Sequence, residues 1–195
     1  MTTPAFLIHV IGCTNAGKST LLAAAPQDWG RVEVGKTLRA KYPPSHFAGQ
    51  CNPKHTAVEA WQIYLDGVAA AEAEGRRIIL IDGQPRDVDQ CAAALSDRHH
   101  IGLRMFLHLW APPETRAARA HARDGADPAR MALTTARLIN DVPANYEVLC
   151  ALMAKNALVV TVDTNANEWS TRDLVMDLGT LAQTHLRNAE VARAS

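Results

Sequence analysis

Residues 12–20 read Gly12-Cys13-Thr14-Asn15-Ala16-Gly17-Lys18-Ser19-Thr20, and they match in full the phosphate-binding pattern G-x-x-x-x-G-K-[ST]. Glycine at positions 12 and 17 lets the backbone turn so that several N–H groups point inward at phosphate oxygens. In this pattern Lys18 reaches the β- and γ-phosphates of a nucleotide, and Ser19 offers its hydroxyl to Mg²⁺. A helix that begins here points the positive end of its dipole at the same site, which favours binding of an anion. The stretch therefore predicts a nucleotide-phosphate site.

The segments on either side of this loop have the expected character. Residues 5–11 are an apolar run of strand length, and residues 20–25 are a good helix opening. Further apolar segments predict strands at 32–34, 77–82, 103–110 and 157–162, and helices are expected at 35–41, 54–74, 86–97, after 112–114, from 128 onward and near the C-terminus. Alternating strands and helices are typical of an α/β fold with a parallel sheet and helices on both faces.

Three of the predicted helices carry features that can be checked. In the helix 54–74 one apolar face is expected from Val58, Trp61, Leu65 and Val68, and Gly75 is expected to end it. Pro143 is expected to interrupt or bend the helix that starts at Pro128. In the last helix an apolar face is expected from Leu174, Leu178 and Leu181.

Composition restricts the function classes. The chain has 195 residues, of which 48% are hydrophobic and 21% charged, and its 20 basic and 20 acidic residues cancel. A neutral balance argues against a broad nucleic-acid-binding face. No run approaches the roughly 18 apolar residues of a membrane span, and residues 1–4 lack the basic region of a signal peptide. We expect a cytoplasmic monomer that binds neither membranes nor nucleic acid.

The cysteines and histidines give no clear metal signature. Cys13, Cys51, Cys91 and Cys150 are scattered, and no C-x-x-C pair occurs. His46, Cys51 and His55 are conceivable metal ligands, although an ordinary polar loop at 43–53 is the better interpretation. The pair His99-His100 is expected on a solvated loop.

Asp82 ends the most continuous apolar strand of the sequence, residues 77–82. Ligands of α/β sheets bind outside the carboxyl ends of the strands. If this strand lies beside the first one, Asp82 comes close to Ser19 and to Mg²⁺ bound there. The alternative role for Asp82 is a helix cap or turn acid.

Four segments resemble the adenylate kinase family. Asp82-Gly83-Gln84-Pro85-Arg86, followed by Gln90, resembles the D-G-F-P-R motif with its adenine-reading glutamine. The segment 34–39, Val-Gly-Lys-Thr-Leu-Arg, is similar to the T-G-D-x-[LM]-R segment of the family's acceptor arm. Residues 111–115 and 136–138 resemble the segments that lead into the lid and follow it. The resemblance covers most of the chain in the right order.

This resemblance implies transfer of the γ-phosphoryl group of ATP, with Mg²⁺, to a nucleoside monophosphate. Arg39 and Arg86 would hold the acceptor's phosphate and Gln90 its base, which favours AMP or dAMP. The remaining acceptor-binding residues would be Gly35, Lys36 and Gly83. We expect a single P-loop NTPase domain spanning residues 1–195, with strand order 2-3-1-4-5, an acceptor arm at about 35–75 and a short lid at about 114–130.

An arginine series is expected to clamp the phosphates. Arg116, Arg119 and Arg123 share one helix face, where like charges repel unless an anion lies among them. Phosphoryl transfer spreads negative charge over the equatorial oxygens, which such a clamp stabilises. A solvated basic face is the alternative. The resulting hypothesis assigns catalytic roles to five residues: Lys18, Arg86, Arg119, Arg123 and Arg137. The residues expected to contact ATP are Arg116, Arg119 and, in the loop, Gly12, Thr14, Asn15, Ala16, Gly17, Lys18, Ser19 and Thr20. The metal ion would be held by Ser19 and Asp82.

Departures from the family pattern gather in the acceptor half. Lys36 stands where the family has Asp, Val34 where it has Thr or Ser, and Gln84 where it has Phe. Donor chemistry is therefore better supported than acceptor identity. One alternative is a kinase that acts on another or modified nucleotide, or on a polynucleotide. The other is a nucleotide-binding module without turnover, against which the intact set of Lys18, Ser19, Asp82 and the arginines speaks.

Overall fold

A computed structural model describes residues 4–43, 57–165 and 170–194 of the chain. Its elements follow the alternation predicted from the sequence. They are β1 (Phe6–Ile11), α1 (Lys18–Ala24), β2 (Gly30–Glu33), α2 (Val34–Lys41), α3 (Ala57–Ala73), β3 (Ile78–Asp82), α4 (Val88–Ser96), β4 (Arg104–Trp110), α5 (Pro113–Asp124), α6 (Pro128–Ala154), β5 (Val159–Asp163) and α7 (Thr171–Ala194).

The five strands form one parallel sheet in the order β2-β3-β1-β4-β5, which confirms the predicted fold class. The central strand β1 pairs with β3 on one side, where Val10 lies opposite Asp82, and with β4 on the other, where Ile11 lies opposite His108. Parallel strands end at a common edge, so the loop after β1, the end of β3 and the end of β4 converge. This edge holds the candidate site.

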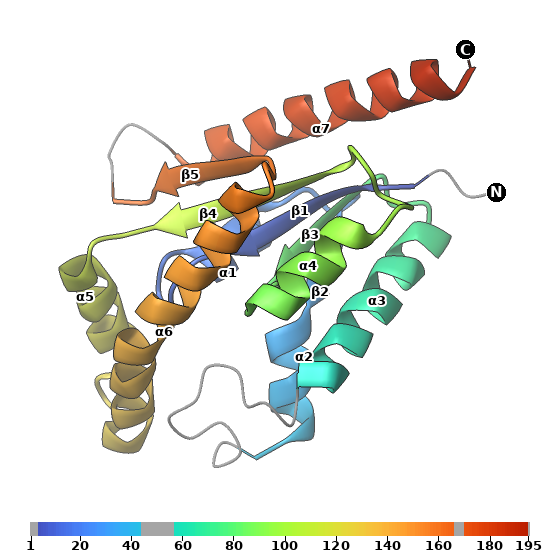
Figure 1. Ribbon diagram of the computed structural model, residues 1–195. Coiled ribbons are helices and arrows are strands. Elements are labelled where there is room, and N and C mark those ends of the chain that lie inside the picture. The colour runs from blue at the N-terminus through green and yellow to red at the C-terminus, as the bar shows by residue number, and fades with distance from the viewer. Residues whose placement is uncertain (1–3, 44–56, 166–169, 195) are drawn as a thin grey trace.

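Both faces of the sheet are covered, as Figure 1 shows, with α7 on one side and α3, α4 and α6 on the other. Successive β1 side chains point to opposite faces. Phe6, Ile8 and Val10 pack with α1 and α7, whereas Leu7 and Ile11 pack toward the helices on the opposite face. Burial on both faces explains why the central strands read as continuous apolar runs and not as alternating ones.

The second strand differs from its prediction. It begins at Gly30 and ends at Glu33, and Val34, expected to close the strand, is the first residue of α2 and fully buried. A Cβ on Gly30 would lie 3.0 Å from the Cβ of Ala71 and 3.1 Å from a side-chain carbon of Ile79. Glycine at this position lets β2 pass close to α3, which a search for apolar runs does not detect.

The buried face of α3 was predicted wrongly. Val58 and Leu65 are 84% and 43% exposed, and the core-facing residues are Ala60, Tyr64, Val68 and Ala71. The small side chains of the two alanines let the helix approach the sheet, while the ring of Tyr64 fills the space between the helix and the sheet. The prediction followed the largest apolar side chains and so missed a face built partly from alanine. The prediction that Val68 faces the core was right, and Trp61 is half-buried against the core.

The helix α6 continues without interruption through Pro143. A proline inside a helix removes one backbone hydrogen bond and crowds the carbonyl four residues earlier. Asp141 before it and Val148 and Leu152 after it are all buried, so tertiary packing holds the helix on both sides of the proline. The last helix behaves as predicted, with Leu174 and Leu178 buried and Leu181 half-buried.

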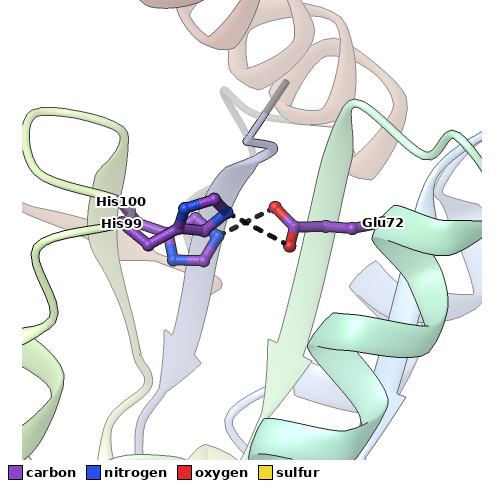
Figure 2. Close-up of side chains that lie close together, drawn as sticks. All are labelled: Glu72, His99 and His100. Carbon is purple, nitrogen blue, oxygen red and sulfur yellow. Dashed lines mark hydrogen bonds and ion pairs between the residues drawn. The ribbon is translucent and has the colours of Figure 1, made fainter. Parts of the chain in front are cut away.

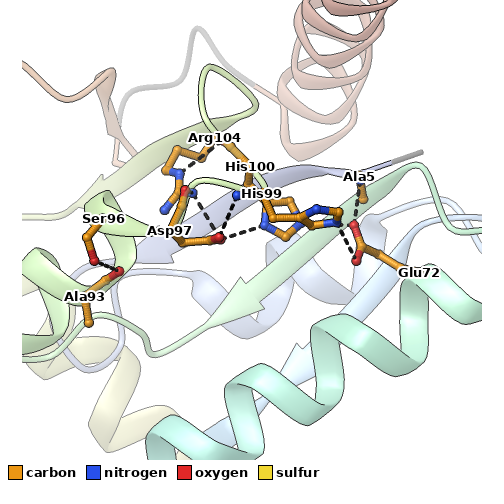
Figure 3. A network of polar contacts seen from close by, with 8 residues as sticks. All are labelled: Ala5, Glu72, Ala93, Ser96, Asp97, His99, His100 and Arg104. Carbon is orange, nitrogen blue, oxygen red and sulfur yellow. Dashed lines mark hydrogen bonds and ion pairs between the residues drawn. The ribbon is translucent and has the colours of Figure 1, made fainter. Parts of the chain in front are cut away.

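His99 and His100 do not both lie on a solvated loop. His100 is only 5% exposed. Its Nδ1 lies 2.7 Å from Oδ2 of Asp97, and its Nε2 lies 3.0 Å from Oε1 of Glu72 on α3. Arg104 donates to Asp97, which links the connection between α4 and β4 to β4 itself (Figure 3). Carboxylates on both sides of one imidazole supply the hydrogen bonds that its burial requires.

Two sequence expectations concern residues outside the described part of the chain. His46, Cys51 and His55, and nearly all of the loop at 43–53, fall between residues 44 and 56. Among the described residues, no helix combines the length and the apolar character that crossing a membrane requires.

Candidate functional site

The loop between β1 and α1 has the backbone conformation that its sequence predicts. Gly12, Asn15 and Gly17 have φ angles of 138°, 63° and 99°. A Cβ added to Gly12 would lie 2.3 Å from the carbonyl oxygen of Leu109 in β4, so the neighbouring strand also excludes a side chain there. Ala16 is buried beneath the loop, and Ser19 and Thr20 are exposed on the first turn of α1. The loop is therefore anchored by its glycines and by core packing.

Lys18 lies across the mouth of this loop. Its ammonium donates to the carbonyl oxygens of Gly12 and Cys13 at 2.7 and 2.9 Å. Burial lowers the pKa of Lys18, and the carboxylates of Asp82 and Asp141 oppose that shift. The side chain is thus a positive charge held among loop carbonyls and two carboxylates, where a nucleotide phosphate can bind to it.

Asp82 and Ser19 carry the oxygen atoms that were predicted to hold a magnesium ion. Asp82 ends β3, paired with Val10 at the point where β1 runs into the loop. Its Oδ1 is buried and has no hydrogen-bond partner among the residues that the structure describes. Carboxylate and hydroxyl oxygens are suitable ligands for Mg²⁺, which usually binds one or two carboxylates together with substrate phosphates. The prediction that the strand of Asp82 lies beside the first strand is confirmed.

Asp141 is a site residue that the sequence reasoning missed. It projects from α6 onto the phosphate-binding loop, where its Oδ2 accepts the backbone N–H of Thr14 at 2.7 Å and also the Thr14 hydroxyl. A carboxylate thus already accepts a hydrogen bond from one of the loop amides. Its spacing could have revealed it, because Asp141 follows Arg137 by four residues and so shares a helix face with it.

Arg116 and Arg119 border the same loop from α5. Arg119 donates to the carbonyl of Asn15 at 3.2 Å and, on the strand β5 side, to the hydroxyl and the carbonyl of Thr164 at 3.0 and 2.9 Å. Arg116 is 5% exposed, and its Nη1 has no hydrogen-bond partner among the described residues. Both residues thus lie beside the phosphate-binding loop, and their contact with a nucleotide stays a prediction.

Arg123 lies in a different environment. It forms an ion pair with Asp124, its Nε and Nη2 lying 3.0 and 2.5 Å from the two carboxylate oxygens. Arg130 and Thr134 from α6 hold the same carboxylate. The hydrogen bond from Arg123, together with the contacts of Thr134 and Arg130, lowers the pKa of Asp124 to about 2 against the effect of burial. These contacts join α5 to α6.

Three arginines form what we call the acceptor-side cluster: Arg39, Arg86 and Arg137. A Cβ on Gly35 would lie 3.1 Å from a terminal nitrogen of Arg39 and 3.1 Å from one of Arg86, so both guanidinium groups flank that glycine. Burial lowers the pKa of Arg39, and the charges of Arg137 and Arg86 lower it further. Positive charges held this close favour binding of an anion.

The turn after β3 orients this cluster. Arg86 Nε donates to the carbonyl of Gly83 at 2.6 Å, and the backbone N–H of Arg86 donates to Oε1 of Gln90 at 2.8 Å. Gly83 has a φ of 81°, and a Cβ there would lie 2.5 Å from Arg86 Nη2. The Nε2 of Gln90 is buried and has no partner among the described residues. Gln90 thus positions Arg86 through its oxygen.

Beneath this turn lies a buried polar pair. Gln84 is fully buried, with neither side-chain amide atom paired among the described residues. Its backbone carbonyl lies 3.1 Å from Nδ1 of His9, which stacks on Phe106. Burial lowers the pKa of His9 to about 3, so its imidazole is neutral at physiological pH. The side chain of Gln84 thus lies inside the core, at the position where the adenylate kinase pattern has Phe.

Lys36 forms an ion pair at the start of α2. Its side chain is 72% exposed and pairs at 3.2 Å with Glu33, the last residue of β2. An exposed pair of this kind contributes at most about 1 kcal/mol to stability. Among the residues predicted to bind the acceptor, Gly35, Arg39, Gly83, Arg86 and Gln90 gather at one place, and the role predicted for Lys36 stays a prediction.

Comparison with solved structures finds the same architecture. The chain is 17% identical to a gluconokinase from Sinorhizobium meliloti 1021, with a TM-score of 0.56 and coverage of 97% of this chain and 95% of that one. It is 16% identical to the tunicamycin resistance protein of Deinococcus radiodurans, with a TM-score of 0.51 and coverage of 91% and 95%. A shikimate kinase from Acinetobacter baumannii, in complex with shikimate, is 17% identical with a TM-score of 0.46 and coverage of 93% and 95%.

No protein-family model and no curated protein matches the sequence. At such low identity, the likenesses to the gluconokinase and to the tunicamycin resistance protein show a shared fold and nothing finer. The predicted α/β fold is therefore confirmed, whereas membership of the adenylate kinase family stays a prediction.

Proposed function

We propose that this protein is an ATP-dependent phosphotransferase whose acceptor is a small molecule that carries an anionic group. The acceptor-side cluster is the observation that supports this most directly. Its Arg39 lies close enough to Asp82 for that carboxylate to counteract the lowering of its pKa, so the cluster adjoins the metal-binding end of β3. A phosphate donor site and an anion site next to each other suit transfer between two anionic substrates.

In this proposal the residues of the chain position charges and do not need a strong base. The loop amides and Lys18 bind the phosphates of ATP, and Mg²⁺ held by Ser19 and Asp82 would offset negative charge on them. Arg39 and Arg86 grip the anion of the acceptor, which guanidinium groups can do bidentately. Arg119, tied to the loop through Asn15, would stabilise the developing charge.

Closure over the ligands is part of the same proposal. The acceptor arm, residues 35–75, and the short lid, residues 114–130, would exclude water that otherwise hydrolyses ATP. The link between Arg123, Asp124 and Arg130 holds the two lid helices together, so α5 and the start of α6 would move as one unit.

For the finer identity of the acceptor, we propose AMP or dAMP as the first candidate. It is supported by the Asp-Gly-x-Pro-Arg segment with its trailing Gln90, and by the unpaired Nε2 of Gln90, a donor for the N1 acceptor of adenine. The Oε1 of Gln90 already accepts from Arg86, so it has one remaining lone pair for the adenine amino group.

A second candidate is a hydroxylated acid or another phosphorylated molecule, including a modified nucleotide. Engagement of Gln90 Oε1 favours it, because a base bound there would have to share this oxygen with the backbone N–H of Arg86. An arginine pair binds carboxylate as readily as phosphate. The likeness to a gluconokinase agrees with this candidate at the level of the fold.

The test is ATP-dependent ADP formation with a panel of acceptors. The panel contains ribo- and deoxynucleoside monophosphates, small hydroxy acids, sugar phosphates and a 5′-hydroxyl oligonucleotide. We expect one of the small anionic classes to raise ADP formation above the acceptor-free rate in the native protein, and Arg39→Ala to raise the acceptor KM. Arg187→Ala, an exposed arginine on α7, is the matched control.

Three results would contradict the proposal or part of it. ATP binding without turnover for every acceptor would identify a binding module. Stimulation by the oligonucleotide alone would replace the small acceptor by a polynucleotide. Stimulation by hydroxy acids but not by nucleotides would leave the kinase proposal intact and exclude AMP.

A further inference from the structure

Two histidines and a glutamate come together at the end of the sheet opposite the phosphate-binding loop (Figure 2). Glu72 lies near the end of α3, and His99 and His100 lie in the connection that precedes β4. One ligand atom from each of the three lies within 4.8 Å of the others. His100 Nε2 is 3.0 Å from Glu72 Oε1, and His99 Nε2 is 3.5 Å from Glu72 Oε2. We propose that these three side chains bind a divalent transition-metal ion of the zinc class.

The spacing of the donor atoms suits such an ion. Metal–nitrogen and metal–oxygen bonds of about 2.0–2.2 Å in a tetrahedral site place neighbouring donors roughly 3.3–3.6 Å apart. The separations of 3.0 Å from His100 Nε2 to Oε1 and of 3.5 Å from His99 Nε2 to Oε2 lie close to that range, and one ligand atom from each residue lies within 4.8 Å of the others. An ion can therefore replace the contacts of Glu72 with the two imidazoles after small shifts of the side chains.

Neighbouring groups already orient the ligands as they are oriented in metal sites. His100 Nδ1 lies 2.7 Å from Asp97 Oδ2, and a proton on Nδ1 leaves the lone pair of Nε2 for a metal. Asp97 is held in turn by Arg104 Nη2 at 3.2 Å and by the backbone N–H of His99 at 2.9 Å. The backbone N–H of Ala5 donates to Glu72 Oε1 at 2.8 Å, which fixes the carboxylate (Figure 3).

The donor set and its exposure select the kind of ion. Two imidazole nitrogens and one carboxylate oxygen suit Zn²⁺, Co²⁺ or Ni²⁺, whereas Mg²⁺ and Ca²⁺ prefer sites made of oxygen alone. The side chains of His100 and Glu72 are 6% and 11% exposed, but that of His99 is 50% exposed. An ion can thus enter from the side of His99 and keep a water as its fourth ligand. Bound there, it would tie α3 to the connection before β4.

The experiment titrates the metal-free full chain with Co²⁺ and follows visible absorption, then displaces Co²⁺ with Zn²⁺. We expect one equivalent with the intense bands of tetrahedral Co²⁺ and no thiolate charge-transfer band. Zn²⁺ at about a hundredfold excess over Kd should raise Tm by roughly 5–10 °C. His99→Ala should weaken binding at least about tenfold, and Asp97→Asn by about 10–100-fold through loss of ligand orientation.

The controls separate this site from others. His121→Ala changes an exposed histidine on α5 and should bind Co²⁺ like the native protein. A thiolate band would place the ion on a cysteine and overturn the proposal. So would unchanged affinity in His99→Ala, a variant that retains the contact between Glu72 and His100. Failure of the native protein to bind Co²⁺ or Zn²⁺ would identify the cluster as an ion-pair network only.

Discussion

Replacing His9 by phenylalanine should make the protein less sensitive to mild acid. His9 lies in the central strand, is fully buried, and stacks on Phe106 with ring centroids 4.8 Å apart. Burial lowers its pKa from 6.5 to about 3. A phenyl ring keeps the stacking and cannot be protonated, at the cost of the hydrogen bond to the carbonyl of Gln84. The variant therefore isolates the cost of charging this imidazole.

The sign and size of the effect follow from that pKa. Between pH 6.5 and about 3 the unfolded chain binds a proton at His9 that the native state does not, so stability falls as the pH falls through this window. Each pH unit well inside the window costs about 1.4 kcal/mol. Lowering the pH from 7 to 5 should therefore remove about 2 kcal/mol through His9 alone. Asp124, with a pKa of about 2, stays ionised over that range.

Urea unfolding of both proteins at pH 7.0, 6.0 and 5.0 measures the difference. The native protein should lose about 2 kcal/mol more than His9→Phe between the two end points, whereas His121→Ala should lose the same amount as the native protein. Equal losses in the native protein and His9→Phe would show that the imidazole of His9 is not held neutral, and the reasoning from burial would be refuted.

Three further predictions concern the candidate site. Lys18→Ala should lower kcat by at least about 10²-fold with an unchanged Tm, because it removes a charge aimed at transferred phosphate; a native kcat would contradict the loop assignment. Arg39→Ala should raise the KM for the acceptor about 10–100-fold, because a charged hydrogen bond worth about 1.5–3 kcal/mol is lost. Isothermal titration should show that the affinity for ATP changes less than twofold. The reverse pattern would mean that the donor and acceptor sites have been assigned the wrong way round. Asp141→Ala should tighten ATP binding roughly tenfold, because it removes the carboxylate that accepts a hydrogen bond from the Thr14 amide, and weaker ATP binding would mean that Asp141 supports the bound state.

The parts of this account that were predictable from sequence depend on local patterns. Gly12, Gly17, Lys18 and Ser19 specify a loop conformation almost by themselves, and the two glycines have φ angles of 138° and 99°. Continuous apolar strands indicated a parallel sheet covered on both faces, and the strand order was predicted from the P-loop fold that the phosphate-binding motif indicated. Asp82 was placed correctly because strand ends meet at one edge of such a sheet.

The failures came from contacts between distant segments. The buried face of α3 depends on small alanines against the sheet, which no list of large apolar residues reveals. The contact of Asp141 with Thr14 spans 127 positions in the chain. His100 is buried because Glu72 and Asp97 supply its hydrogen bonds, and neither partner is marked by a sequence motif. The arginines of α5, alike in spacing, separate because Asp124 engages Arg123.

Transfer of label from [γ-³²P]ATP tests the central claim most directly. The native protein is incubated with Mg²⁺, labelled ATP and each candidate acceptor, and the products are separated. The account predicts label on a small anionic acceptor, ADP formed in equal amount, and loss of that product in Lys18→Ala and, at low acceptor concentration, in Arg39→Ala. Label found only in inorganic phosphate, at a rate independent of every acceptor, would contradict it.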